Sequence, residues 1–259
     1  MVWPVTQEPQ SNPFGEGLSE QAAHRYKRVR PGYPPEAVRE IFSCLPRGGR
    51  VADLGAGTGQ LTRSLIKEGF GVIAVEPSAS MRAALTSEPW ANTANLEVRP
   101  TLAEDTGIEA CSVDAVVWAD SFHWLNAKEA AGEAGRILKR NGLAFLLANQ
   151  LDVSKPWVHR LSRIMRSGDV LRNVPPGLLG PQFTKTSERE WKWEQTLLTT
   201  DVLELAKTRS SYLRSNQESR KRMQKNLDWY LHSHLGFARA EEVTLPYRTV
   251  LSAFALRSD

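Results

Sequence analysis

Short apolar runs alternate with segments of helical periodicity along the first 150 residues of the chain. A short apolar run between turn-forming residues is typical of a strand that is buried on both faces. Between the runs, apolar side chains recur three and four positions apart, which is typical of a helix that buries one face. We therefore expect strands over 51–54, 72–75, 96–99, 113–118 and 143–148. This alternation predicts a parallel sheet with helices on both faces.

The intervening helices are predicted to begin at capping residues or at prolines. Ser19 suits the start of a short helix over 19–26, and the prolines at 34 and 35 open another helix after a turn. A later alanine-rich helix is expected to bury Leu138 and to end at the turn over 140–142. Further N-caps are expected at Ser78 or Ser80, Asn126, Thr200 and Asn216.

The pattern changes after residue 150. It predicts a helix around 157–165, a Pro/Gly loop over 174–181, a strand over 190–197 and two more helices, the second running from Asn216 to His234. The β-rich end over 247–256 predicts an antiparallel strand pair at the sheet edge. We expect a flexible lead over 1–17 and a cofactor-binding core over 18–150. Lid helices and closing strands of the same domain follow over 151–259.

Composition narrows the class of protein. The 33 basic and 29 acidic residues are interspersed, and their small excess does not by itself indicate nucleic acid. No apolar run approaches the length of a membrane span, so we expect no membrane segment. Cys44 and Cys111 lie far apart and match no metal spacing, which favours two free thiols. A cytoplasmic protein is the expectation.

The first strand leads into a loop with three glycines, which is the strongest functional signal in the chain. Asp53 ends the strand, and Gly55, Gly57 and Gly59 follow at alternate positions before a helix begins. Such a loop lets a ligand approach the backbone closely at a helix N-terminus. Glu76 ends the second strand, where a carboxylate suits the two hydroxyls of a ribose. The pattern predicts an adenosine-type cofactor, although a ligand-free turn is the simpler alternative.

Two kinds of nucleotide site do not fit this loop. A dinucleotide fingerprint needs glycine where Gln60 stands, and a P-loop needs a lysine that the loop lacks. The string Asp-x-Gly-x-Gly-x-Gly over 53–59 instead resembles the first motif of class I S-adenosylmethionine-dependent methyltransferases. The matching stretches, in chain order, are 53–59, 75–81, 103–105 with 112–114, 121–124, and 133–142. One departure is Asn141-Gly142, where this family usually has Gly-Gly.

The resemblance covers roughly residues 20–150, and it implies a fold and a cofactor. The fold is α/β, a Rossmann-like doubly wound seven-stranded sheet with an antiparallel C-terminal strand and a helical lid. The cofactor is S-adenosylmethionine. Tyr26, Arg30 and Tyr33 resemble the N-terminal lead of a small-molecule subgroup that includes trans-aconitate methyltransferase.

The family pattern also implies roles for single residues. Asp53 would accept a hydrogen bond near the cofactor amino group, the loop glycines would approach its methionine half, and Glu76 would hold the ribose. Met81 would pack on the adenine, with a plain core role as the alternative. Arg30 would hold the cofactor carboxylate or an anionic substrate, or only pack at the surface. The expected cofactor-binding set is Tyr26, Arg30, Asp53, Gly55, Ala56, Gly57, Gly59, Glu76, Met81, Ala103, Glu104 and Ala119.

His123 lies just after the fourth strand, at the sheet edge where ligands bind in this class of fold. It is a candidate general base, although it could equally serve as a wall of the pocket. A carboxylate acceptor would need no base, because it is already ionised at neutral pH. Asp120 alone does not make a metal site, and His232 and His234 are poorly spaced for one, so no metal is expected.

The favoured function is methylation of a small molecule, with the oxygen of a carboxylate or hydroxyl as acceptor. Residues 119–122 read Ala-Asp-Ser-Phe, whereas amino-methylating enzymes of nucleic acids carry Asn/Asp-Pro-Pro-aromatic at this place. A methyltransferase for a macromolecule and a non-catalytic, cofactor-binding regulatory protein stay open as alternatives. The basic side of the segment 220–225 is interpreted as a solvated helix face, and the oligomeric state is left open. The expected pocket is partly apolar, lined by some of the aromatics Trp157, Phe183, Trp191, Trp193, Tyr212 and Trp229.

Overall fold

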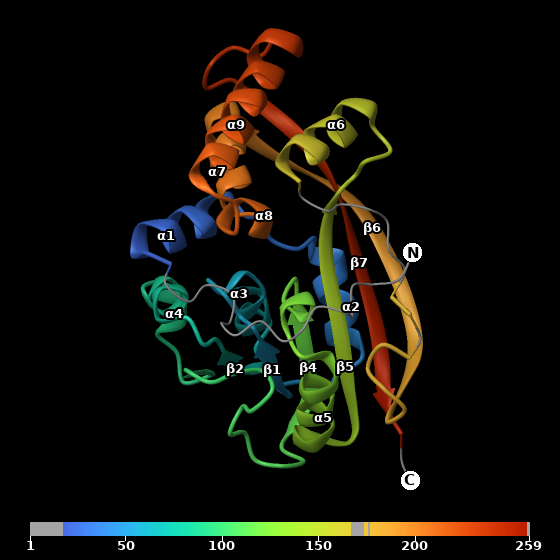
Figure 1. Cartoon of the computed structure of the whole chain (residues 1–259). Helices are drawn as coiled ribbons and strands as arrows, with labels where there is room; N and C mark the ends of the chain where they lie inside the picture. Colours follow the sequence, from blue (N-terminus) through green and yellow to red (C-terminus); the bar gives the residue numbers. More distant parts are fainter. Residues whose placement is uncertain (1–17, 167–173, 176, 258–259) are drawn as a thin grey trace.

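The computed structural model describes residues 18–166, 174–175 and 177–257, and one seven-stranded sheet forms its centre (Figure 1). The strands lie in the order β3-β2-β1-β4-β5-β7-β6. Strands β1 to β5 are parallel, and β7 is antiparallel to both of its neighbours. Their bounds are β1 Arg50–Leu54, β2 Gly71–Val75, β3 Leu96–Arg99, β4 Val113–Ala119, β5 Leu138–Leu151, β6 Phe183–Leu198 and β7 Glu242–Leu256. The predicted fold class is confirmed.

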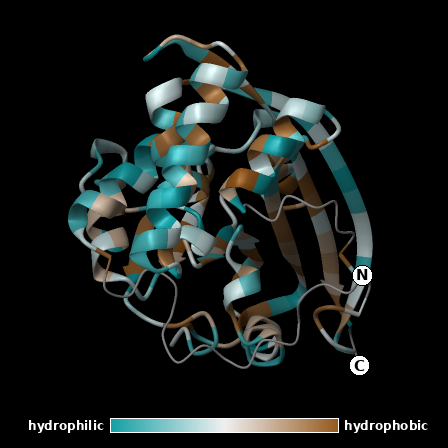
Figure 2. Ribbon diagram, turned by 45° about the horizontal axis from the view of Figure 1, so that its top comes forward, coloured by the Kyte–Doolittle hydropathy of each residue, from teal (hydrophilic) through white to brown (hydrophobic). Residues whose placement is uncertain are grey.

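Helices cover both faces of the sheet because successive residues of each buried strand point to opposite faces. Val51 packs in one hydrophobic cluster with α2 (Pro35–Ser43) and α3 (Gln60–Lys67). Its neighbour Ala52 packs in another cluster with α5 (Ala127–Ile137). Figure 2 shows the result, with apolar strands in the interior and polar helix surfaces outside.

A third hydrophobic cluster lies beyond the carboxyl ends of the parallel strands (Figure 1). This cluster joins the C-terminal end of β5 and the N-terminal end of β7 to a group of helices that we call the lid. The lid consists of α6 (Pro156–Met165), α7 (Thr199–Lys207), α8 (Ser210–Leu213), α9 (Gln217–Asp228) and the π-helical turn η3 (Trp229–His234). Helix α1 (Glu20–Val29) contacts both α7 of the lid and α4 (Ala79–Thr86) of the core. These contacts place α1 between the two halves.

Most of the predicted helix starts are confirmed by side-chain hydrogen bonds. Ser19, Ser78, Asn126 and Asn216 each accept a backbone N–H from the first turn of their helix. The prediction for Thr200 is wrong, because α7 begins at Thr199 with no side-chain cap. There the chain enters the helix directly from the end of β6, and the backbone N–H of Thr199 bonds to a carbonyl of the turn before β7 instead.

Three segment boundaries also differ from expectation. Helix α5 ends at Ile137, not at the turn over 140–142, because Leu138 already pairs with Val113 as the start of β5. Strands β6 and β7 are longer than predicted, because their pairing continues through the polar residues 184–189 of β6 and through the segment 242–246 of β7, in which Val243 and Leu245 are buried. β6 is an edge strand whose polar side chains are mostly exposed. The predicted helix from Asn216 to His234 gives way to the π-helical turn, and His234 is exposed.

Some expectations lie outside the described residues, namely the lead over 1–17 and positions 167–173 and 176 of the region after α6. Cys44 and Cys111 are both exposed and free. Within the described ranges, no helix combines the length and the hydrophobicity that crossing a membrane requires.

A buried hydrogen-bond network ties the closing strands to the N-terminal turn. Thr249 of β7 donates to Asn149 Oδ1 of β5 at 2.5 Å and accepts from Trp193 Nε1 of β6 at 2.8 Å. Asn149 Nδ2 in turn donates to the carbonyl of Gly32 at 2.7 Å. One fully buried hydroxyl therefore serves three strands.

We predict that Thr249→Val lowers the free energy of unfolding by roughly 2 kcal/mol, because it leaves a buried amide oxygen and an indole N–H without their partner. Urea denaturation measures the loss. Thr196→Val is the matched control, since its hydroxyl contacts Thr244 on the exposed side of the same strand pair. An equal loss in both variants would contradict the role of the network.

Candidate functional site

The loops after β1, β2 and β4 meet at one edge of the sheet. Because β2 lies on one side of β1 and β4 on the other, the strand order reverses here. In open α/β sheets, ligands bind at the carboxyl ends of the strands at such a reversal. The glycine loop over 55–59, the turn over 76–78 and the loop over 120–125 form this part of the structure.

All three glycines of the first loop have positive φ, at 77° for Gly55, 58° for Gly57 and 85° for Gly59. A Cβ on Gly55 would lie 2.6 Å from the Cβ of Ser121, so the loop and the segment after β4 are in tight contact. A Cβ on Gly59 would meet Leu85 at 2.9 Å. At Gly57, by contrast, no atom lies within 4 Å of that position. The middle of the loop is therefore the point that is open to a ligand.

Asp53 lies beneath this loop and is fully buried. Its Oδ2 accepts a hydrogen bond from Thr62 Oγ1 at 2.6 Å, while Oδ1 has no partner among the described residues. Burial raises the pKa of Asp53 to about 6, against the opposing effect of the Thr62 hydrogen bonds. A buried carboxylate oxygen without a partner is costly, and a ligand ammonium group would satisfy it.

Glu76 links the glycine loop to the turn after β2. Its Oε2 accepts the backbone N–H of Gly57 at 2.9 Å, and its Oε1 accepts that of Ser78 at 2.8 Å. The residue is only 5% exposed, and burial raises the pKa of its carboxyl to about 7. The two backbone hydrogen bonds and Arg82 oppose that rise. Each oxygen keeps a further lone pair, which is what the two hydroxyls of a ribose require.

The other residues predicted at the cofactor lie around this centre. The Gly55 and Ala56 amides already donate to the Val75 carbonyl, at 2.8 and 3.1 Å. Met81 is 1% exposed in a small cluster with Ala23, so a core role is what the structure shows for it. Ala119 ends β4.

Ala103 and Glu104 belong to the segment that follows β3. Ala103 is buried in the same cluster as the inner face of α5. Glu104 Oε1 accepts the backbone N–H of Asn126 at 2.9 Å. This contact holds the segment against the loop after β4, so Glu104 has a structural role whether or not it also touches an adenine.

Arg30 is tied to the lid. Its Nε and Nη2 donate to the hydroxyl and the carbonyl of Thr208, at 3.0 and 2.9 Å, and its guanidinium lies 4.8 Å from the ring centre of Tyr26. A role for Tyr26 and Arg30 at the cofactor stays a prediction. What the structure brings together is the end of α1 and the end of α7, directly beside the glycine loop. Gln60 Nε2 completes that link by donating to the Lys27 carbonyl at 3.1 Å.

Asp120 lies beside the glycine loop, but it is absent from the set of residues predicted to bind the cofactor. It adopts a positive φ of 56°, which is uncommon for a residue other than glycine and is often found at functional sites. Its carboxylate accepts from Tyr33 Oη at 3.1 Å and from the Asn149 backbone N–H at 3.0 Å. Burial raises the pKa of Asp120, and burial with this carboxylate raises that of Tyr33 well above its usual value. An acid directly after a buried strand, as with Asp53, is the signal that could have identified it.

His123 lies in a short 3-10 turn after β4 and is exposed. It lines a pocket on the β5 side of the loop, together with Trp118, Asp120, Phe122 and Gln150. The guanidinium of Arg214, just after α8 of the lid, lies 4.8 Å from the Trp124 ring centre. None of the six aromatic residues that were expected to line the acceptor pocket is among the residues that line this one. Phe183 is buried in the core, and Trp193 stacks on Tyr247.

The described residues fit the cofactor that the sequence predicts. The site offers two buried carboxylates, an open backbone position at Gly57 and no basic side chain in the loop. Such a site disfavours phosphate and favours a ligand with an ammonium group and a hydroxylated sugar. Among the residues that the structure covers, no group of three or more His, Cys, Asp or Glu side chains is placed to hold a metal ion.

Comparison with known proteins points in the same direction. A family model described as a methyltransferase domain matches residues 52–146. An uncharacterised methyltransferase of Mycobacterium tuberculosis is 33% identical over 230 residues, which cover 88% of this chain and 91% of the relative. A protein of Saccharomyces cerevisiae named a probable S-adenosylmethionine-dependent methyltransferase is 32% identical over 127 residues, covering 47% of this chain and 43% of its own.

Solved structures share the fold at lower identity. A candidate type II methyltransferase of Anaeromyxobacter dehalogenans superposes with a TM-score of 0.63 at 20% identity, covering 88% of this chain and 97% of the other. A phosphoethanolamine N-methyltransferase of Haemonchus contortus, solved with phosphomonomethylethanolamine and S-adenosylhomocysteine, gives 0.54 at 16% identity and covers 93% of this chain and 58% of its own.

We predict that Glu76→Gln makes the stability of the ligand-free protein less dependent on pH. The pKa of Glu76 in the folded protein, about 7, lies above the ordinary glutamate value of 4.5, so the cost of burying the charge grows as pH rises through this interval. Between pH 5 and pH 8 the wild type should lose roughly 2 kcal/mol relative to the variant. Urea denaturation of both proteins at the two pH values measures this, and a difference that does not change with pH would refute it.

Proposed function

The chain belongs to the S-adenosylmethionine-dependent methyltransferases, and from that premise we propose that it methylates a small molecule on an oxygen atom. Methyl transfer from a sulfonium is an in-line displacement, in which the new oxygen–methyl bond forms as the sulfur–methyl bond breaks. The protein's contribution is to align the two reactants and to exclude water.

The observation that carries the proposal is the pocket beside the glycine loop. Its residues Asp120 and Phe122 flank Ser121, which packs against Gly55 and donates to the Leu54 carbonyl at 2.6 Å. A molecule in this pocket would therefore lie next to a cofactor on the loop. The pocket is small, with a volume of about 40 Å³, and its walls combine aromatic and aliphatic side chains with a few polar groups, a composition that small-molecule sites share.

A carboxylate is the acceptor that we favour among oxygen groups. The N-terminal residues Tyr26, Arg30 and Tyr33 resemble those of the trans-aconitate methyltransferase subgroup, and Arg30 is held at the junction of α1, α7 and the glycine loop. A hydroxyl acceptor would need a base, for which His123 is the exposed candidate in the pocket. The Haemonchus neighbour, named for an amine substrate, supports the small-molecule class rather than the choice of oxygen.

The experiment that tests the proposal measures S-adenosylhomocysteine release across a library of carboxylic acids, alcohols and amines. We expect release only when a small carboxylic acid or hydroxyl compound is present. Release with amines alone would refute the choice of oxygen. Release with RNA or protein, and with no small molecule, would refute the whole proposal.

Variants of His123 then separate the two oxygen acceptors. With a carboxylate acceptor, His123→Gln should change kcat by less than about threefold, because an ionised acceptor has no proton to lose. With a hydroxyl acceptor, kcat of the variant should be lower than that of the wild type by about 100-fold or more. The wild-type kcat should also decrease at acid pH, where a general base is protonated, and the variant should lack this decrease. Rates from pH 6 to pH 9 for wild type and variant make this measurement, and a 100-fold loss with a carboxylic acid as substrate would refute the carboxylate mechanism.

Cofactor binding should weaken as the buried carboxylates take up protons. Because ribose hydroxyls bond best to a charged Glu76, whose pKa lies at about 7, we expect the dissociation constant for S-adenosylmethionine to rise about tenfold from pH 8 to pH 6. Calorimetry measures it. Glu76→Ala and Asp53→Ala should lose binding, whereas Glu109→Ala, at an exposed glutamate, should not. Unchanged affinity in both site variants would refute the assigned roles.

A further inference from the structure

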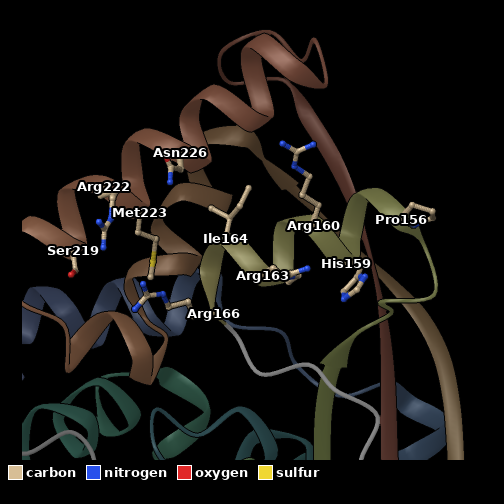
Figure 3. Close-up of a pocket in the computed structure, with 10 residues that line it drawn as sticks. All are labelled: Pro156, His159, Arg160, Arg163, Ile164, Arg166, Ser219, Arg222, Met223 and Asn226. Carbon is tan, nitrogen blue, oxygen red and sulfur yellow. The ribbon is translucent and has the colours of Figure 1, made fainter.

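A basic groove runs between helices α6 and α9 of the lid (Figure 3). Its volume is about 560 Å³, and its walls come from α6 with the residue after it and from α9. The α6 side contributes three arginines, Arg160, Arg163 and Arg166, and α9 contributes Arg222. His159 is also part of the wall, and none of the described residues that line the groove is acidic.

The arginines of this groove lack the ion-pair partners that about half of the other described arginines have. Arg39 and Arg239, for example, pair with Glu36 and Asp228. Arg163, Arg166 and Arg222 have no carboxylate within salt-bridge distance among the described residues. Like charges gathered in one concave surface repel one another, and the repulsion is relieved when an anion binds. The net charge of the chain is only +4, so this clustering is local.

Arg160 shows how the groove holds one of these groups in place. Its guanidinium lies 5.3 Å from the ring centre of Tyr230 and 5.7 Å from that of Trp229. Contact with aromatic rings uses the face of the guanidinium and leaves its in-plane N–H groups available for a ligand. Trp229 is 48% exposed, a large exposure for an indole on a lid helix.

We propose that this groove binds a small molecule that carries a phosphate or pyrophosphate group. Planar guanidiniums that line one groove are well suited to phosphate oxygens, because each can donate a pair of parallel hydrogen bonds. The volume of about 560 Å³ is that of a small-ligand site. The non-basic lining residues Ile164, Met223 and Asn226 provide apolar and amide contacts for the organic part of such a ligand.

The groove belongs to the same lid that contacts the cofactor-binding core. Helix α7 ends at Thr208, which holds Arg30, and Arg214 after α8 lies over Trp124 beside the acceptor pocket. The phosphate could therefore be part of the methyl acceptor or belong to a separate molecule that binds the lid. The two sources share their chemistry at the groove, and competition with the acceptor distinguishes them.

The test is calorimetric titration of the full chain with inorganic pyrophosphate at 150 mM salt, without cofactor or acceptor, so its result does not depend on methyl transfer. We expect saturable binding that weakens at least tenfold in Arg163→Gln and in Arg222→Gln. Lys221→Gln is the matched control, because Lys221 neighbours Arg222 on α9, is exposed and does not line the groove. It should change affinity by less than twofold.

Folding of the variants is checked by their melting temperature and by S-adenosylmethionine binding, both of which should match the wild type. An equal loss of pyrophosphate affinity in Lys221→Gln and Arg222→Gln would show diffuse charge attraction and overturn the proposal. Absence of pyrophosphate binding would overturn it as well, and so would tight binding of a 12-nucleotide RNA that pyrophosphate does not displace.

A second experiment measures inhibition of methyl transfer by pyrophosphate. Inhibition that is competitive with the acceptor assigns the phosphate to the acceptor, and non-competitive inhibition assigns it to a separate ligand.

Discussion

The buried carboxylate of Glu76 is the interaction on which the cofactor end of this protein depends. By accepting the N–H groups of Gly57 and Ser78, it holds the glycine loop of β1 against the turn of β2. Burial away from water raises the pKa of Glu76, as it does that of Asp53, because it destabilises the charged form of each carboxyl group. Two such groups around one open backbone position form a site that favours a positively charged, hydroxylated ligand, and that preference agrees with the family to which the chain belongs.

The lid is attached to this core by a few polar contacts around a hydrophobic cluster of its own. Arg30 joins α1 to Thr208, and the Asn149–Thr249–Trp193 network carries the connection across β5, β7 and β6. Asp120 belongs to the same connection, because its carboxylate binds Tyr33 on one side and the Asn149 backbone on the other. Asp120 also lines the pocket beside the glycine loop, whose other described walls come from the end of β4 and the loop after it, from β5, and from Val174 and Val250.

Two regions of the described structure concentrate charge of one sign. Asp53 and Glu76 lie buried at the glycine loop, and four arginines line the groove between α6 and α9. Each arrangement is unfavourable in isolation, because buried or crowded like charges lack compensation. Ligands of opposite character would stabilise the two regions, a cationic cofactor at the first and a phosphate group at the second.

The sequence alone determined the order of strands and helices in the core, the family and the position of the glycine loop, because each of these depends on local signals. Buried strands appear as apolar runs, the glycines stand where backbone must reach positive φ, and most helix starts carry a capping side chain. Only the tertiary structure decided the length of β6, an edge strand of polar residues that is stabilised by pairing with β7. It also decided that Arg30 binds Thr208, 178 positions away, that Asp120 accepts a hydrogen bond from Tyr33, and that arginines of α6 and α9 share one groove. These contacts join residues far apart in the chain, and no local pattern records which distant partner a side chain will meet.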